Sequence, residues 1–278
     1  ALPADVTFDG AALPTLADLR LVRNERLQTG GERHAQQRLA RFLEQALSDY
    51  KTDRDRMDRE GTSRLSADLK FGTLSARTAW AAVSSQPPSD GKRSFLNELV
   101  WREFAHSTLW DRPELLEQPF RPRFAQFPWR DDDVIFEAWA TGQTGIPIVD
   151  PAARQLLAEG FVHNRARMIA ASFLTKQLMI SYRRGEAHYM KWLTDGDWAQ
   201  NNAGWQWSAG CGCDAQPYFR VFNPTLQGQR FDPDGDYVRR WVPELLRMPA
   251  RHIHAPAQAP ADVLAQAGVR FEKDYPAP

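Results

Sequence analysis

Cysteine and long apolar runs are scarce in this sequence. Its 278 residues include 2 cysteines, Cys211 and Cys213, and such a pair without clustered histidines predicts neither a disulfide framework nor a metal site. No apolar run approaches the roughly 20 residues that cross a bilayer. The start, ALPADVTFDG, lacks the basic and apolar regions of a secretion signal. These absences indicate a soluble protein of a reducing compartment, and we expect a cytoplasmic location and no membrane partner.

Net charge is also missing, which excludes a uniformly basic surface. Lys+Arg and Asp+Glu both number 35, so the formal net charge is zero with histidine neutral. Any site for a polyanion must therefore be a local basic patch. Tryptophan, by contrast, is abundant: 10 residues are unusual for this length. This excess indicates stacking or light chemistry.

Apolar positions spaced by three and four, with almost no alternating strand pattern, predict an all-α fold. The 42% hydrophobic content can supply a sizeable core. Residues 1–30, with scattered proline and glycine, are predicted to be a linker, and the tail after Pro249 is predicted to wrap the surface. The predicted helices are Glu32–Tyr50, Ser94–Leu109, Pro151–Glu159, His163–Tyr182 and Glu186–Leu193, with loops at Gly61–Ser66 and Asp111–Arg130.

The segment TDGDWAQNNAGWQW, which begins at Thr194, concentrates carboxylates, amides and indoles. Thr194 and Asp197 are three apart, as in a capping box that opens a helix. Gly196 between two carboxylates also suits a close backbone approach to a ligand, and Asn201 and Trp205 share one helix face. The spacing supports a helix cap and a ligand site equally.

Two further motifs combine hydroxyl, amide and guanidinium groups. GTSRLS at Gly61–Ser66 offers three hydroxyls and an arginine, which suits a phosphate-cradling turn but is also common in plain loops. The helix from His163 carries Asn164, Arg167 and Met168 on one stripe, which fits either an anion-lined pocket or a solvated face.

The segment SFLNELVWREF places a carboxylate, an indole and a guanidinium together. Glu98, Trp101 and Arg102 stand at i, i+3 and i+4, so their side chains project from one helix face. The alternative interpretation is a surface ion pair beside a partly exposed tryptophan.

In combination these motifs are far more specific than each alone. TSRLS, FGTLSARTAW, NELVWREF, TGIPIVDPAARQL, HNRARMIAASFL, DGDWAQNNAGWQW and YFRVFNPTLQGQRFD follow one another in this order. They resemble the flavin-binding domain of the DNA photolyase and cryptochrome family, most closely class I cyclobutane pyrimidine dimer photolyases. The resemblance runs from about Glu32 to Pro278. It implies an interdomain segment at residues 1–30 and a helical FAD-binding catalytic domain at 31–278. The family's amino-terminal α/β antenna domain, with any antenna chromophore, is not found in this sequence.

The resemblance implies FAD, active in its fully reduced form, as the cofactor. Asn201 matches the position that faces the flavin N5, and Arg167 with Asp195 is expected to form a charge pair at the flavin edge. The implied cofactor-binding residues are Tyr50, Thr62, Ser63, Arg64, Leu65, Ser66, Arg102, Asn164, Arg167, Asp195, Gly196, Asp197 and Asn201.

The resemblance also implies a monomeric deoxyribodipyrimidine photo-lyase, a carbon-carbon lyase that associates with the nucleoid when it binds ultraviolet-damaged DNA. Asn164 and Met168 stand where (6-4) enzymes carry histidines, which favours cyclobutane dimers. Glu98 would bond the dimer's carbonyl edge, and burial would favour its protonated form. The implied DNA-binding residues are Arg54, Glu98, Trp101, Arg102, Asn164, Arg165, Met168, Trp207, Arg220 and Gln227.

The family's light-driven electron path to the surface has one departure here. Trp205 and Trp129 match its inner and outer tryptophans, but the middle position is Tyr182, so Trp192 or Trp139 is considered as a bypass. The predicted catalytic residues are Trp205, Tyr182, Trp129 and Glu98. Two alternatives stay open: a cryptochrome-type photoreceptor without repair, and a helical single-strand-binding module without enzyme activity.

Overall fold

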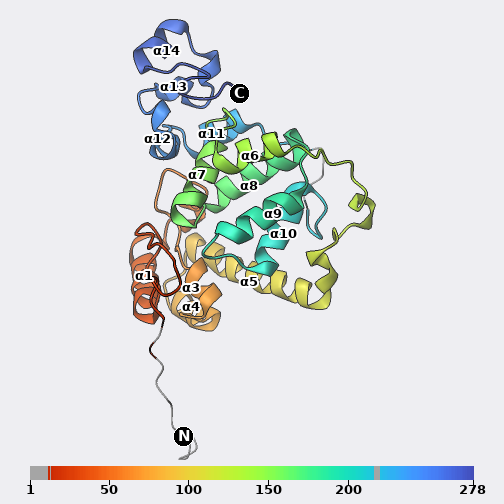
Figure 1. The fold of residues 1–278 in the computed structure, drawn as a ribbon. Coiled ribbons are helices and arrows are strands. Elements are labelled where there is room, and N and C mark those ends of the chain that lie inside the picture. Colours follow the sequence, from red (N-terminus) through yellow and green to blue (C-terminus); the bar gives the residue numbers. More distant parts are fainter. Residues whose placement is uncertain (1–11, 13, 216–219) are drawn as a thin grey trace, which may run out of the picture.

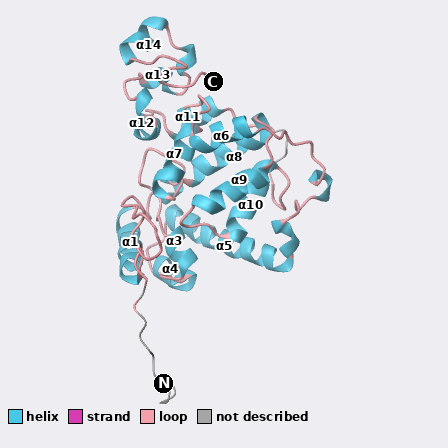
Figure 2. Ribbon diagram, viewed as in Figure 1, coloured by secondary structure: helices cyan, strands magenta, loops and turns pink. Residues whose placement is uncertain are grey.

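Helices supply the regular structure of the computed structural model, which describes residues 12, 14–215 and 220–278 (Figure 1). Figure 2 shows the helices joined by loops, and in these ranges there is no strand, only the isolated bridges Arg130–Ile180 and Phe271–Tyr275. The all-α prediction is therefore confirmed. None of the helices in these ranges has the length and apolar character that crossing a membrane requires. Residues 1–11 and 13 of the predicted linker lie outside the described residues.

Short helices at the start of the chain precede one long helix, α5, and a central stack. The first group is α1 (Glu32–Gln45), α2 (Tyr50–Asp53), α3 (Ser66–Phe71) and α4 (Ala76–Ser84), followed by α5 (Asp90–Asp111). The central stack is α6 (Asp133–Thr141), α7 (Asp150–Glu159), α8 (Asn164–Ser172), α9 (Tyr182–Trp192) and α10 (Trp198–Ala209). The last group is α11 (Pro224–Phe231), α12 (Asp236–Trp241), α13 (Ala250–Ile253) and α14 (Ala261–Ala267), of which α13 and α14 project from one end in Figure 1. Between them lie the short turns η1 (Pro113–Leu116), η2 (Pro122–Phe124), η3 (Phe173–Gln177), η4 (Pro243–Leu245) and η5 (Pro256–Gln258).

Local chemistry sets several helix ends. The Ser89 side chain accepts a hydrogen bond from the Lys92 amide at 3.0 Å and caps α5. Asp132 caps α6 in the same way, and Gly142 ends α6 in the left-handed region at φ 70°. Such caps satisfy amides and carbonyls that a helix end leaves unpaired.

Two hydrophobic cores meet at one seam. The larger core lies among the central helices and includes the fully buried Leu156 and Ile169. The smaller core joins α1, α2 and α5, where the Phe42 and Phe95 ring centroids are 4.6 Å apart. Met57 follows α2 in the chain but packs in the larger core. The loop after α2 therefore runs from the smaller core to the larger one.

The predicted helix Glu32–Tyr50 is interrupted. α1 ends at Gln45, and the amides of Ala46 and Leu47 both donate to the Phe42 carbonyl at 3.0 and 2.9 Å. This closing turn directs the Leu47 carbonyl toward α5, and Tyr50 begins the separate helix α2.

The predicted helix His163–Tyr182 is also two helices. α8 widens into the π-helical turn η3, where Lys176 and Gln177 donate to carbonyls of Arg220 and Phe222 at 2.9 and 3.0 Å. After this turn the chain reverses, and Ser181 caps α9. Tyr182 therefore begins α9, which the prediction Glu186–Leu193 started one turn too late.

The prediction that the tail after Pro249 wraps the surface is incomplete. It forms α13 and α14 and buries Val263, Val269 and Tyr275. The Tyr275 hydroxyl donates to the buried carboxylate of Asp150 at 2.5 Å, across 125 positions of sequence. This bond joins the tail to the start of α7.

The close approach of α5 to the α1–α2 turn generates a stability prediction. A Cβ atom at Gly91 would lie 1.8 Å from the Leu47 carbonyl oxygen. We expect Gly91→Ala to lower the free energy of unfolding by roughly 2–4 kcal/mol, because backbone must move to admit the methyl group. Gly204 on α10 has open space around its Cβ position, so Gly204→Ala should raise that free energy by about 0.5–1 kcal/mol. Urea denaturation measures both, and equal effects of the two substitutions would contradict the prediction.

Candidate functional site

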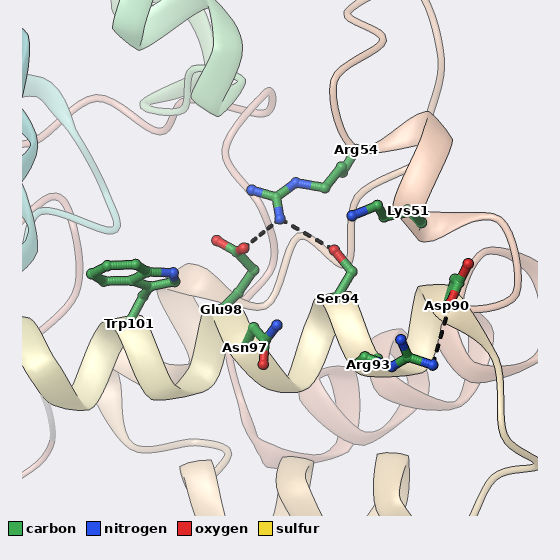
Figure 3. A pocket seen from close by; sticks show the side chains of 8 residues that line it. All are labelled: Lys51, Arg54, Asp90, Arg93, Ser94, Asn97, Glu98 and Trp101. Atoms are coloured by element: carbon green, nitrogen blue, oxygen red, sulfur yellow. Dashed lines mark hydrogen bonds and ion pairs between the residues drawn. The ribbon is translucent and has the colours of Figure 1, made fainter. Parts of the chain in front are cut away.

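A cavity of about 380 Å³ opens between α2 and α5. Figure 3 shows Arg54 and Lys51 on one side and a row of α5 side chains on the other, with Trp101 at one end. The indole is about half exposed, so its face is available for stacking. The cavity thus combines an aromatic wall with charged groups of both signs. The lining residues are Lys51, Arg54, Asp90, Arg93, Ser94, Asn97, Glu98 and Trp101.

Inside the cavity the Glu98 carboxylate is paired with the guanidinium of Arg54. Arg54 forms an ion pair with the Glu98 carboxylate and donates a hydrogen bond to the Ser94 hydroxyl at 3.3 Å. Burial is the largest influence and lowers the pKa of Arg54, but the charge and hydrogen bond of Glu98, together with Tyr50 and Asp55, make the net shift upward. The Glu98 side chain is 33% exposed. The carboxylate is thus half-buried and paired with a cation.

The charge pair expected between Arg167 and Asp195 is present. Arg167 Nη2 donates to both carboxylate oxygens of Asp195 at 3.0 and 2.8 Å. Its Nε donates to the Val162 carbonyl at 2.8 Å, which fixes the plane of the guanidinium. Asp195 is buried, so its charge is compensated where water is scarce.

Asp197, and not Thr194, caps α10. The Asp197 Oδ1 atom accepts from the Gln200 amide at 3.0 Å, so the capping box predicted from Thr194 is wrong by one turn. Thr194 instead donates its amide to the Gly160 carbonyl at 2.8 Å. The second carboxylate oxygen of Asp197 lies 3.1 Å from His106 Nε2. His106 on α5 is a partner that the sequence patterns did not indicate.

Asn201 has a fixed amide orientation. Its Nδ2 donates to the Glu186 carbonyl on α9 at 3.0 Å. This bond uses one of the two Nδ2 protons, and Oδ1 accepts a hydrogen bond but cannot donate one. The side chain is half-buried. The position therefore suits an N–H group on a bound molecule.

The residues of the TSRLS loop differ in burial and in their contacts. Arg64 adopts φ 55°, and its guanidinium lies 3.6 Å from the Phe161 ring centroid. Leu65 is buried at 1% exposure, so only its backbone can meet a ligand. The Ser63 hydroxyl accepts from the Leu65 amide at 3.4 Å. Thr62 and Ser66 are half-buried, as a phosphate-binding turn requires.

Three buried donor atoms near these residues have no protein acceptor: Arg102 Nε, His163 Nε2 and Arg165 Nε. An unpaired buried donor is costly, so a ligand rich in acceptor oxygens would complete them. The Nδ1 atom of His163 accepts from the Arg165 amide at 3.1 Å, which assigns the proton of the neutral ring to Nε2. FAD carries phosphate and carbonyl oxygens, so the donor set fits this cofactor. The sequence patterns missed His163, although it stands directly before α8.

The other predicted DNA-binding residues do not line the cavity. Asn164 is exposed and its Nδ2 lies 3.7 Å from the Met168 sulfur. Arg165 pairs with Asp55 at 2.6 Å and lies 4.3 Å from the Phe231 ring centroid. The remaining members are Trp207 on α10 and Gln227 on α11, both half-buried, and the exposed Arg220. The cavity adds Lys51, Arg93 and Asn97, which the sequence patterns missed.

The aromatic residues of the predicted electron path fall into two separate contact groups. The Trp129 and Tyr182 ring centroids are 6.4 Å apart. Trp205, however, has its ring contacts with Tyr189 at 5.2 Å and Trp139 at 6.0 Å. The Trp205 edge lies against α9 because Gly185 has no side chain there. The outer half of the predicted path is thus in contact, and Trp139 is a direct neighbour of its inner end.

Comparison with known proteins gives one family and related sequences. Residues 95–278 match the family described as the FAD binding domain of DNA photolyase. The deoxyribodipyrimidine photo-lyase of Agrobacterium fabrum is 47% identical over 253 residues, 90% of this chain and 53% of that protein. The photo-lyase of Thermus thermophilus is 48% identical over 215 residues, 77% of this chain and 51% of that protein. The chain spans about half the length of these relatives.

Solved structures show the same arrangement of helices. A bacterial class III photolyase from Agrobacterium tumefaciens has a TM-score of 0.91 at 44% identity, over 95% of this chain and 57% of that one. A cryptochrome from Synechocystis sp. has a TM-score of 0.87 at 34% identity, over the same shares of 95% and 57%. The expected fold is confirmed, and it is common to both functions. The class I assignment stays a prediction.

The buried His163 generates a pH prediction. Burial lowers the pKa of His163 from 6.5 to about 4. The folded protein therefore binds fewer protons here than the unfolded chain, and stability present above pH 6.5 is lost as the pH falls toward 4. We expect His163→Asn, which keeps a capping acceptor, to remove up to about 3 kcal/mol of this acid-induced loss. Urea denaturation between these pH values measures it.

The exposed His34 on α1 supplies the control. His34→Asn should leave the pH dependence of the unfolding free energy unchanged. If His163→Asn also leaves the pH dependence unchanged, His163 is not the source of the acid-induced loss of stability.

Proposed function

Because the chain belongs to the family of the FAD-binding domain of DNA photolyase, we propose that it is the catalytic part of a light-driven photo-lyase for cyclobutane pyrimidine dimers. The observation that carries the proposal is the cavity lined by Trp101, Arg54 and Glu98. An aromatic wall with cations at its rim suits a dimer flipped out of the duplex.

Arg167, Asp195 and Asn201 are suited to hold FAD. Arg167 and Asp195 present a rigid, compensated ion pair, which can polarise the flavin edge without leaving a buried charge unpaired. Asn201 offers an acceptor oxygen, which fits a reduced flavin that carries N5–H. When bound in its fully reduced form, FAD supplies a light-driven electron that splits the dimer and is afterwards returned. The protein's contribution is positioning, exclusion of water and electrostatics.

The cavity residues are suited to hold the dimer. Trp101 would stack on a pyrimidine, and Lys51 and Arg93 supply positive charge for strand phosphates. We expect the Arg54–Glu98 pair, and not an isolated acid, to meet the polar edge of the dimer, because the two side chains already neutralise each other. Asn164 and Met168 are uncharged, which agrees with a reaction that needs no protonating group at their positions.

The decisive test is repair itself. The reduced, flavin-loaded protein is illuminated with blue light together with an oligonucleotide that contains one thymine cyclobutane dimer, and the remaining dimers are counted against a dark control. Light-dependent loss of dimers is expected. Retention of every dimer, with the flavin spectroscopically present, would contradict the proposal and favour a photoreceptor of the cryptochrome kind.

Trp101 should be needed for recognition of the dimer. We expect Trp101→Ala to weaken binding of the dimer-containing oligonucleotide roughly 10- to 100-fold, because one stacked base contributes about 1–3 kcal/mol. Trp110 lies on the same helix, is exposed and does not line the cavity, so Trp110→Ala should bind like the unmodified protein. Fluorescence anisotropy measures both affinities, and equal losses would remove Trp101 from the site.

Tyr182 should slow or divide flavin photoreduction. Burial, and then Cys211 and Glu186, raise the pKa of Tyr182, so the phenol is protonated before oxidation. Oxidation of a phenol releases this proton, and burial hinders that release. We expect Tyr182→Trp to accelerate photoreduction and Tyr182→Phe to slow it, while repair by flavin reduced beforehand persists. Transient absorption measures the rates; no change in either variant would exclude Tyr182 from the path and favour the Trp139 contact.

A further inference from the structure

The π-helical turn η3 contains a lysine that the proposed reaction does not use. Lys176 is only 9% exposed, and the turn is closed by the Leu178 amide, which donates to the Phe173 carbonyl at 3.0 Å. Phe173, Leu174 and Leu178 of the same stretch pack in or against the larger core. Burial of an ammonium group costs free energy, and π-helical turns are frequent at functional sites. A function for this side chain is therefore expected.

Two neighbouring side chains of the turn bind the backbone of residues 220–222. Lys176 Nζ donates to the Arg220 carbonyl at 2.9 Å, and Gln177 Nε2 donates to the Phe222 carbonyl at 3.0 Å. The two acceptors are two residues apart and accept from the same turn, as alternate carbonyls of an extended segment can. The turn thus fixes this segment at two points, although it lies more than 40 positions away in sequence.

The fixed segment carries an exposed cation. The side chain of Arg220 is exposed, while its carbonyl is bound to Lys176. Burial, and then the positive charge of Arg220, lower the pKa of Lys176, and no carboxylate of the described residues opposes them. Two like charges therefore lie close enough to repel each other. An anion at this place on the surface would relieve the repulsion.

We propose that Lys176 is a positioning residue for DNA binding, which fixes the backbone of residues 220–222 so that the guanidinium of Arg220 meets a strand phosphate. This role rests on the proposed function and on the expectation that Arg220 contacts DNA. A backbone that is already fixed loses less conformational entropy when its side chain binds, so the contact with the phosphate is stronger. Lys176 itself acts through the carbonyl and does not touch the DNA.

The salt dependence of DNA binding tests this role, with flavin-loaded protein and the dimer-containing oligonucleotide. Arg220→Ala should reduce the steepness of log affinity against log salt concentration by about 1, because one phosphate contact is lost. Lys176→Met, which has a similar volume and no charge, should reduce the steepness by the same amount. The double variant should show no further reduction. Additive reductions, or an unchanged slope in either single variant, would overturn the proposal.

Lys191→Met is the matched control, because Lys191 is an exposed lysine on α9. Its slope should equal that of the unmodified protein. An equal reduction of the slope in Lys191→Met and Lys176→Met would indicate a general effect of net charge, and it too would overturn the proposal.

Limited digestion with trypsin tests the hold on the segment without DNA. Cleavage after Arg220 requires a locally loosened backbone, so it should be several-fold faster in Lys176→Met than in the unmodified protein or in Lys191→Met. Equal cleavage rates in the three proteins would contradict the positioning role. If none of them binds the oligonucleotide, the proposed function fails instead, while faster cleavage of Lys176→Met still establishes that Lys176 holds the segment.

Discussion

The pairing of the DGD carboxylates, the buried Asp195 and the half-buried Asp197, is the constraint on which the candidate site depends. Asp195 is paired with Arg167 from α8, and Asp197 contacts His106 from α5. A buried charge without a partner would cost several kcal/mol. The two aspartates can therefore stand side by side in sequence only because α5, α8 and α10 meet at this point. The same contacts hold in place the helices that carry Trp101 and Asn201.

The charged groups of the candidate site are paired, but some of its hydrogen-bond donors have no protein acceptor. Arg102, His163 and Arg165 each keep a buried nitrogen without a protein acceptor, while their charges or second nitrogens are satisfied. Such donors favour an acceptor-rich ligand over water or an apolar molecule. The ion pairs of these residues are therefore formed before any ligand binds.

The cavity residues and the buried aromatic cluster differ in their access to solvent. Trp101, Arg54 and Glu98 lie at the open cavity between α2 and α5. Trp205, Trp139 and Tyr189 pack in the closed core, where each is at most 3% exposed. Exposure suits a group that stacks on a substrate, and burial suits groups that exchange electrons without reacting with solvent. Tyr182 is buried as well, and burial raises the pKa of its phenol, so the group retains its proton.

Periodicity and motif order were sufficient to predict the all-α class and the family, since these depend on local patterns and on long specific motifs. The partners were not predictable. Glu98 stands next to Arg54, Asp197 next to His106, and Tyr275 next to Asp150 only because distant segments pack together. Helix ends failed for the same reason: the turns at Ala46 and η3 are set by contacts with α5 and with residues 220–222. The sequence by itself determined which chemical groups are available. The tertiary structure alone decided which of them neutralise one another, because pairing depends on proximity in space and the pattern of one helix does not encode its neighbours.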